Sequence, residues 1–248
     1  MTIRPLARSV AAPAWTWLTT PPPDLVTDED RRTTDMVGLR LPSRASAAVA
    51  IATFVLLLDF SRILLPATIV AAGRGPEGLR WIALERFALF VVVPLAVVLL
   101  AFRDRPGRYG LTLGDVQAGL ALTMVGAAVM TPIVLWFATL PDVRAYYGTG
   151  AAPLPNVVLT NAIELTAAEF LFRGFLMFTL VRAVGPIGVL IAVMPFAYAH
   201  VGKPELELLS TLGGGLAYGW LAWRTRSIAW GAIAHVYIMT LVIVAAGR

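Results

Sequence analysis

The chain has 248 residues, of which 58% are hydrophobic and only 14% are charged, a composition that excludes an ordinary soluble domain and indicates an integral membrane protein. Its net charge of +5 comes from arginines that lie between apolar stretches instead of on one basic face, so we expect no nucleic-acid partner. The chain has no cysteine, which excludes disulfides, thiolate nucleophiles and cysteine-bound metals.

The first 46 residues differ in composition from the rest of the chain. They contain three consecutive prolines at 21–23, an acidic cluster at 28–30, and four arginines between 31 and 44. We expect residues 1–46 to form a polar, loosely ordered extension and residues 47–248 to form a transmembrane domain.

The remainder of the chain divides into apolar stretches separated by short polar segments. About 20 apolar residues are needed to cross the hydrocarbon core as a helix. On that basis we predict an all-α, polytopic membrane helical bundle of about seven transmembrane helices, within a range of six to eight. The expected spans are 47–72, 82–102, 117–140, 156–181, 185–201, 206–223 and 228–246. The fifth and sixth are short and interrupted by Gly and Pro, so a re-entrant or tilted helix is an alternative there.

Basic residues between the spans predict how the chain crosses the membrane. Cytoplasmic loops carry an excess of Lys and Arg. One side would hold Arg31, Arg32, Arg40, Arg44, Arg103, Arg105, Arg108, Arg182, Arg224 and Arg226, and the other side the lighter set of Arg74, Arg80, Arg144 and Lys203. We therefore expect a multi-pass protein of the plasma membrane with a cytoplasmic N-terminus.

Several ionisable residues fall inside the predicted spans, where each costs roughly 2.5–3.5 kcal/mol on insertion scales. Asp59 and Arg62 are three apart and are expected to pair as a structural link. Glu169 and Arg173 are four apart on one helix and are also expected to pair. A purely structural ion pair is the alternative to a functional role for Glu169 and Arg173.

The only two histidines, His200 and His235, also lie in strongly apolar stretches. Together with Glu169 they would bring titratable groups from three helices to one site. Such a set suits hydrolysis, because a carboxylate or imidazole can take a proton from water while a second imidazole and an arginine stabilise the developing oxyanion. Alternatively, His200, His235 and Glu169 would hold a zinc ion with an open position for water.

Three segments resemble the motifs of the CAAX-protease and bacteriocin-processing intramembrane protease family. The first is Ala168-Glu169-Phe170-Leu171-Phe172-Arg173-Gly174, the second runs from Phe196 to His200, and the third is His235. The family patterns are Glu-Glu-x-x-x-Arg, Phe-x-x-x-His, and a His followed four positions later by Asn or Asp. The resemblance covers roughly residues 105–246 and implies an intramembrane endopeptidase with Glu169, Arg173, His200 and His235 as site residues.

Two positions depart from the family patterns. Ala168 stands where the family has its first glutamate, which is thought to activate water, and Met239 stands where it has Asn or Asp. Two other carboxylates are candidates to substitute. Glu164 lies one helical turn before Ala168, and Glu207 begins the helix that follows His200. Neither matches a motif, and an interfacial or solvated glutamate is the alternative for each.

The resemblance thus implies a CAAX-type protease, with a metalloprotease as one form, that hydrolyses a peptide or protein substrate at the lipid bilayer with activated or zinc-bound water. The alternative is a catalytically impaired member that acts as a membrane binding or scaffold protein, because Ala168 and Met239 depart from the motifs. A proton-coupled carrier is least favoured, since the chain has no internal repeat.

Overall fold

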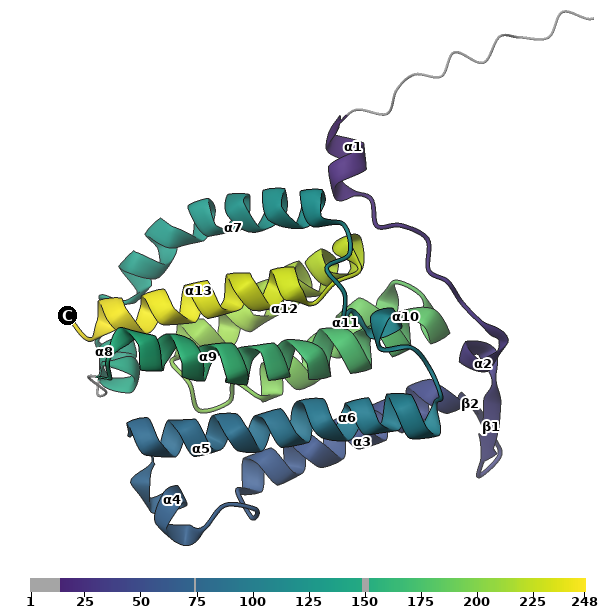
Figure 1. Ribbon diagram of the computed structural model, residues 1–248, viewed down its shortest axis with the longest axis horizontal. Coiled ribbons are helices and arrows are strands. Elements are labelled where there is room, and N and C mark those ends of the chain that lie inside the picture. Colours follow the sequence, from purple (N-terminus) through teal and green to yellow (C-terminus); the bar gives the residue numbers. More distant parts are fainter. Residues whose placement is uncertain (1–13, 74, 149–151) are drawn as a thin grey trace, which may run out of the picture.

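The structure is a computed structural model that describes residues 14–73, 75–148 and 152–248. Within them, long helical segments run roughly side by side and alternate in direction (Figure 1). Residues 1–13 of the predicted extension, together with Arg74, lie outside the described residues.

The first half of the chain contains a short hairpin and two long helical segments. Its elements are α1 (Ala14–Thr19), α2 (Asp28–Arg31), β1 (Thr33–Met36), β2 (Leu39–Pro42), α3 (Ser43–Ser61), α4 (Ala67–Ala72), α5 (Pro76–Phe87), η1 (Ala88–Val92), α6 (Val93–Ala96), η2 (Val97–Ala101) and η3 (Pro106–Tyr109). The elements from α5 to η2 follow without a break and form one rod, in which η1 and η2 are π-helical. β1 and β2 pair antiparallel, with Thr33 opposite Pro42.

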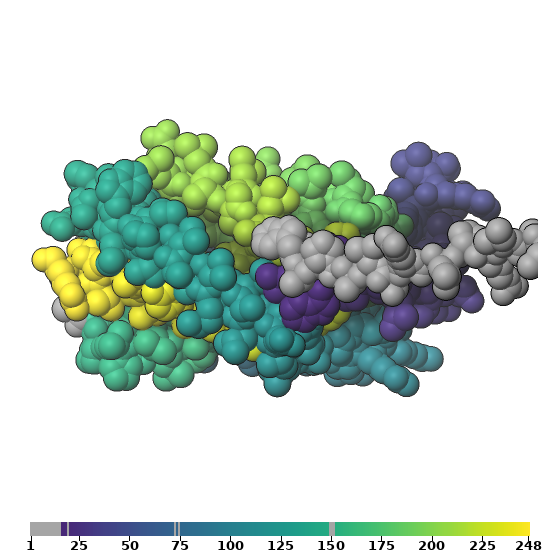
Figure 2. Space-filling view, turned by 90° about the horizontal axis from the view of Figure 1, so that it is seen from above, coloured from purple at the N-terminus to yellow at the C-terminus, as the bar shows by residue number. Residues whose placement is uncertain are grey.

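The second half contains five long helical segments. Its elements are α7 (Val116–Phe137), α8 (Pro141–Tyr147), α9 (Leu154–Glu169), η4 (Phe170–Met177), α10 (Phe178–Val184), α11 (Ile187–Tyr198), α12 (Glu205–Thr225) and α13 (Ala229–Ala246). The elements α9, η4 and α10 form one continuous rod with a π-helical middle. In a view at right angles to Figure 1, α7 lies across one face, and the C-terminal part of α13 lies at one end of the molecule (Figure 2).

The predicted all-α membrane bundle is confirmed. Four segments are long and apolar enough to cross a membrane, namely Ser43–Ser61, Pro76–Ala101, Val116–Phe137 and Ala229–Ala246. The rods at 154–184 and 205–225 correspond to the fourth and sixth predicted spans but are not among these four segments, and α11 is a shorter apolar helix. These described rods and helices match the seven expected spans in order.

The first predicted span, 47–72, is wrong at its C-terminal end. Helix α3 stops at Ser61, and Arg62 adopts a left-handed conformation with φ 53°. Pro66 then precedes the separate helix α4, since proline and the residue before it disfavour a continuing helix. The apolar residues after Leu64 therefore belong to a second short element.

The core of the bundle surrounds the π-helical segment η4. Every residue from Phe170 to Met177 is buried, and these side chains pack against α3, η1 and α11. Gly174 permits this density, because a Cβ there would lie 2.8 Å from the backbone oxygen of Tyr109. The rod that carries Glu169 and Arg173 is thus the central helix of the fold.

The described loop arginines predicted to share one side do lie at one end of the bundle. We call this the arginine-rich end; it comprises the start of α3, the loop from 102 to 115, the loop after α10 and the loop after α12. The extension is attached here through Asp30, which is 3% exposed and pairs with Arg44, Arg108 and Arg182 at 3.1, 2.6 and 3.4 Å. Part of the extension predicted to be loosely ordered therefore forms α2 and the hairpin.

Candidate active site

Glu169 lies at the last turn of α9 and is completely buried. Its Oε1 atom is 3.3 Å from Nη1 of Arg173 and 3.0 Å from Nδ1 of His235. The predicted pairing of Glu169 with Arg173 is confirmed, and the tertiary structure adds His235 to it. A buried carboxylate is tolerable here because Arg173 balances its charge and His235 adds a hydrogen bond.

Helix α13 approaches Glu169 closely because it has glycine at position 231. A Cβ at Gly231 would lie only 3.1 Å from Oε2 of Glu169. One turn later on the same helix, the ring of His235 stacks on Tyr218 of α12, with centroids 5.0 Å apart. Because Gly231 has no side chain, helix α13 can bring the imidazole of His235 to the carboxylate of Glu169.

The ring of Phe196 connects His200 to this cluster. Its centroid lies 3.9 Å from the guanidinium carbon of Arg173, 4.6 Å from the ring of His200 and 6.2 Å from the ring of His235. A cation above an aromatic face is attracted to it. The four residues predicted for the site, Glu169, Arg173, His200 and His235, are therefore gathered around one aromatic side chain.

The hydrogen bonds of the two histidines determine which ring nitrogen carries the proton. Nδ1 of His200 is 2.8 Å from the backbone oxygen of Phe196, and Nδ1 of His235 faces the carboxylate of Glu169. A backbone oxygen can accept a hydrogen bond but cannot donate one, and the same is true of the Glu169 carboxylate when it is ionised. Each Nδ1 therefore carries the hydrogen. In both neutral imidazoles the lone pair then lies on Nε2.

Hydrogen-bonding capacity remains inside this cluster. Oε2 of Glu169 and both terminal nitrogens of Arg173 are buried and have no hydrogen-bond partner among the described residues. Buried polar groups that stay unsatisfied are costly and uncommon. A polar ligand that reached the cluster would therefore find both acceptor and donor groups.

The residues predicted to bind zinc do not fit a complete metal site. Within residues 14–73, 75–148 and 152–248, no three His, Asp or Glu side chains are grouped as ligands. The Oε1 atom of Glu169 is already engaged by His235 and Arg173. A zinc site needs at least three ligands gathered around one point, so the described residues do not support a metalloprotease.

The two candidate substitute carboxylates lie in other contacts. Glu164 forms an ion pair with Arg86 of α5, and Glu207 accepts hydrogen bonds from Tyr147 and Lys203. Neither forms a described hydrogen bond with His200 or His235. Of the two, only Glu164 lines the large cavity beside the histidine cluster.

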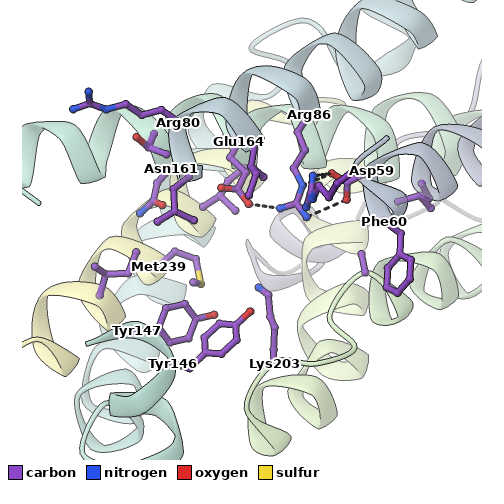
Figure 3. Close-up of a pocket in the computed structure, with 18 of the residues that line it drawn as sticks. Asp59, Phe60, Arg80, Arg86, Tyr146, Tyr147, Asn161, Glu164, Lys203 and Met239 are labelled. Carbon is purple, nitrogen blue, oxygen red and sulfur yellow. Dashed lines mark hydrogen bonds and ion pairs between the residues drawn. The ribbon is translucent and has the colours of Figure 1, made fainter. Parts of the chain in front are cut away.

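This cavity has a volume of about 800 Å³ and lies between α3, α5, α9, α11 and α13. Figure 3 shows Glu164 and Arg86 on one wall and Tyr146, Tyr147 and Lys203 on the other. Arg86 also bonds Asp59 at 2.8 Å, which joins three helices in one charged network.

The motif cluster adjoins the cavity without lining it. Leu165, Ala199 and Met239 belong to the cavity wall and are four, one and four residues from Glu169, His200 and His235. Ala168 is partly buried beside the core. Both departures from the motifs thus put an apolar side chain where the family has a polar one, Met239 on the cavity wall and Ala168 against the core.

Sequence reasoning missed the role of Arg86 and the full role of Asp59. The predicted pair of Asp59 and Arg62 is confirmed at 2.7 Å, and Arg62 also bonds Glu85 at 2.6 Å. Arg86 lies near the start of the predicted span 82–102, a position from which a long side chain is expected to reach water. The available signal was the presence of charges of both signs in adjacent spans, which favours pairing between helices.

Comparison with known proteins supports the motif resemblance. Residues 150–241 match the family model described as type II CAAX prenyl endopeptidase Rce1-like, and the matched region contains all three motif segments. No curated protein matches the chain. No solved structure matches it either.

Proposed function

From the match of residues 150–241 to the Rce1-like type II CAAX prenyl endopeptidases, we propose that the chain is an intramembrane endopeptidase that hydrolyses a peptide bond with a histidine-activated water. The observation that carries this proposal is the contact of 3.0 Å between His235 Nδ1 and Glu169 Oε1, beside His200 and Arg173. A carboxylate that fixes an imidazole in this way leaves Nε2 as a base.

The proposed reaction needs both imidazoles. A water molecule that donates one hydrogen to Nε2 of His235 and the other to Nε2 of His200 keeps its oxygen lone pairs free for attack. His235 takes one proton as the water oxygen bonds to the peptide carbonyl carbon, and the carbonyl oxygen becomes an oxyanion. When the C–N bond breaks, His235 returns this proton to the amine. His200 and His235 are thus the proposed catalytic residues.

Glu169 and Arg173 have a supporting role in this proposal. The carboxylate of Glu169 is fully buried and already engaged, so it orients His235 and stabilises the imidazolium that forms during the reaction. Arg173 supplies the positive charge that balances the carboxylate. Both are positioning residues, and together with His235 they provide a base at a site where Ala168 offers no carboxylate.

The test uses purified protein in detergent and a membrane-tethered reporter peptide. We expect His235→Ala and His200→Ala each to lower the cleavage rate by roughly 10²–10⁴-fold, the usual contribution of general acid–base catalysis. Glu205→Gln is the control, because Glu205 is exposed at the start of α12. Variants with the unfolding temperature of the parent but an unchanged rate would refute the proposal.

The second candidate function is a non-catalytic membrane binding protein. The observation in its favour is that Ala168 and Met239 place apolar side chains where the family has polar ones, Met239 on the cavity wall and Ala168 against the core. In that case the purified parent shows no cleavage above the rate of His235→Ala. The same assay therefore distinguishes the two candidates.

A further inference from the structure

The large cavity lies entirely toward one end of the bundle. It is lined by the C-terminal halves of α3, α11 and α13 and by the N-terminal halves of the two rods that begin with α5 and α9. Because neighbouring rods alternate in direction, these halves share the end opposite to the arginine-rich end (Figure 1). The cavity therefore opens away from the end that carries the extension.

The inner wall of the cavity reaches the proposed catalytic residues. Ala199 precedes His200 directly, and Met239 lies one helical turn after His235 on α13. A volume of about 800 Å³ falls in the usual range of ligand pockets, about 300–1,000 Å³. A short extended segment in the cavity would thus lie next to the parts of α11 and α13 that lead to the two histidines, which do not themselves line the cavity.

Charge indicates which compartment the cavity faces. The arginine-rich end carries Arg44, Arg103, Arg105, Arg108, Arg182, Arg224 and Arg226 in short loops or at span ends. The described loops and span ends on the other side carry the smaller set of Arg62, Arg80, Arg144, Lys203 and Arg248. Since Lys and Arg are retained in the cytoplasm, the arginine-rich end is the cytoplasmic one.

We propose that the cavity opens to the extracytoplasmic side and admits an extended peptide segment that is tethered to the outer leaflet. This inference rests on the proposed protease function and adds the side from which the substrate enters. The substrate class is an extracytoplasmic segment next to a membrane anchor, not a cytoplasmic chain end.

The lining of the cavity fits such a segment chemically. Phe60 and Tyr198 line it and are also 80% and 76% exposed, so apolar surface continues from the cavity to the lipid-facing exterior. Asn161 and Glu164 provide polar groups on the opposite wall, where a peptide backbone needs hydrogen-bond partners. The cavity therefore suits a chain that is apolar at its anchor and polar where it is cleaved.

The side of the opening can be measured without any activity, because the chain has no cysteine. Val201→Cys places a thiol on the cavity lining, at a residue that is 58% exposed. Val37→Cys, the control, places one at the tip of the hairpin at the arginine-rich end. In intact cells, a membrane-impermeant maleimide should label Val201→Cys and should label Val37→Cys only after lysis. Absence of labelling at Val201→Cys in intact cells would overturn the inference.

A second experiment tests the substrate class. Two reporters with the same cleavable segment are anchored so that it faces either the outside or the cytoplasm, with His235→Ala protein as the background. We expect cleavage of the extracytoplasmic reporter alone. Cleavage of the cytoplasmic reporter, or of neither, overturns the entry inference. In detergent no membrane separates two compartments, so the cleavage assay with purified protein tests the proposed function independently of the side of entry.

Discussion

At the scale of single residues, the main feature is that the carboxylate of Glu169 interacts with both Arg173 and His235. Oε1 of Glu169 lies 3.3 Å from Arg173 and 3.0 Å from His235, while all three side chains are nearly excluded from solvent. An ion pair of this kind contributes little net stability, yet it is costly to break because a charge is left behind. Its retention therefore favours a role in orienting His235.

The first prediction concerns the stability of this pair. Glu169→Ala should lower the free energy of unfolding by about 3–5 kcal/mol, because Arg173 is left buried without its counter-charge. The double variant Glu169→Ala, Arg173→Leu should recover a large part of that loss without recovering cleavage. Unfolding in detergent measures the first effect and the reporter assay the second. If the double variant cleaved as fast as the parent, the pair would be structural only.

The second prediction concerns the two departures from the motifs. Ala168→Glu combined with Met239→Asn adds a carboxylate directly before Glu169 and an amide on the cavity wall. It should raise the cleavage rate, because a second base becomes available to the water. Ala168→Gln with Met239→Asn is the matched control, since it has similar volume and no charge. Equal rates for the two double variants would show that the added carboxylate takes no part.

At the scale of elements, close packing against glycines determines how the helices meet. Helix α7 is mostly exposed, but it contacts α13 at Gly119, where a Cβ would lie 2.3 Å from the indole of Trp230. That indole is held in place, because its Nε1–H donates to the backbone oxygen of Leu113 at 2.9 Å. Helix α13 is the one that carries His235, so this contact supports the site indirectly.

The third prediction tests this contact. Gly119→Ala should lower the free energy of unfolding by roughly 1–3 kcal/mol, the usual cost of overpacking. Gly126→Ala on the same helix is the control, because no described heavy atom of a neighbouring element lies within 4 Å of the place that a Cβ would take there. Thermal unfolding of the two variants in the same detergent gives the comparison. Equal unfolding temperatures would mean that Trp230 moves aside without cost.

At the scale of the whole molecule, the extension is attached to the arginine-rich end by ion pairs. Burial opposes the ionisation of Asp30, but hydrogen bonds from the backbone and side chain of Thr27 and from Arg108 hold the pKa of Asp30 well below its ordinary value. Arg224 adds a second attachment, since it donates to the backbone oxygens of Trp17 and Leu18. The extension therefore closes the end of the bundle opposite to the cavity.

The fourth prediction is the pH dependence of this attachment. A carboxylate with a lowered pKa stabilises the folded state above the pKa it has when unfolded, about 3.9, and the contribution is lost as pH falls through the folded value. A fluorophore on Val37→Cys should thus gain mobility only below about pH 4. Asp30→Asn should make it mobile at neutral pH, whereas Asp28→Asn, at an exposed neighbour, should not. An immobile fluorophore in Asp30→Asn at neutral pH would contradict this role.

Much of the fold was predictable from local pattern. The apolar stretches predicted the described helices in order, because each span must bury its own backbone hydrogen bonds in a bilayer. The break after Ser61 was missed, since the apolar composition continues through Pro66 and hides the end of the helix. The attachment of Asp30 was missed because its three arginine partners are distant in sequence.

The sequence by itself determined the class of the protein, the order of its helices, the pairing of Glu169 with Arg173, and the motif segments that match the Rce1-like family. These features depend on composition and on spacing within one helix. Only the tertiary structure decided that His235 bonds Glu169, that Phe196 joins the two histidines, and that Glu164 pairs with Arg86 in the cavity. Each of these contacts depends on the axial offset and tilt between helices, which side-chain packing sets and which no local pattern encodes.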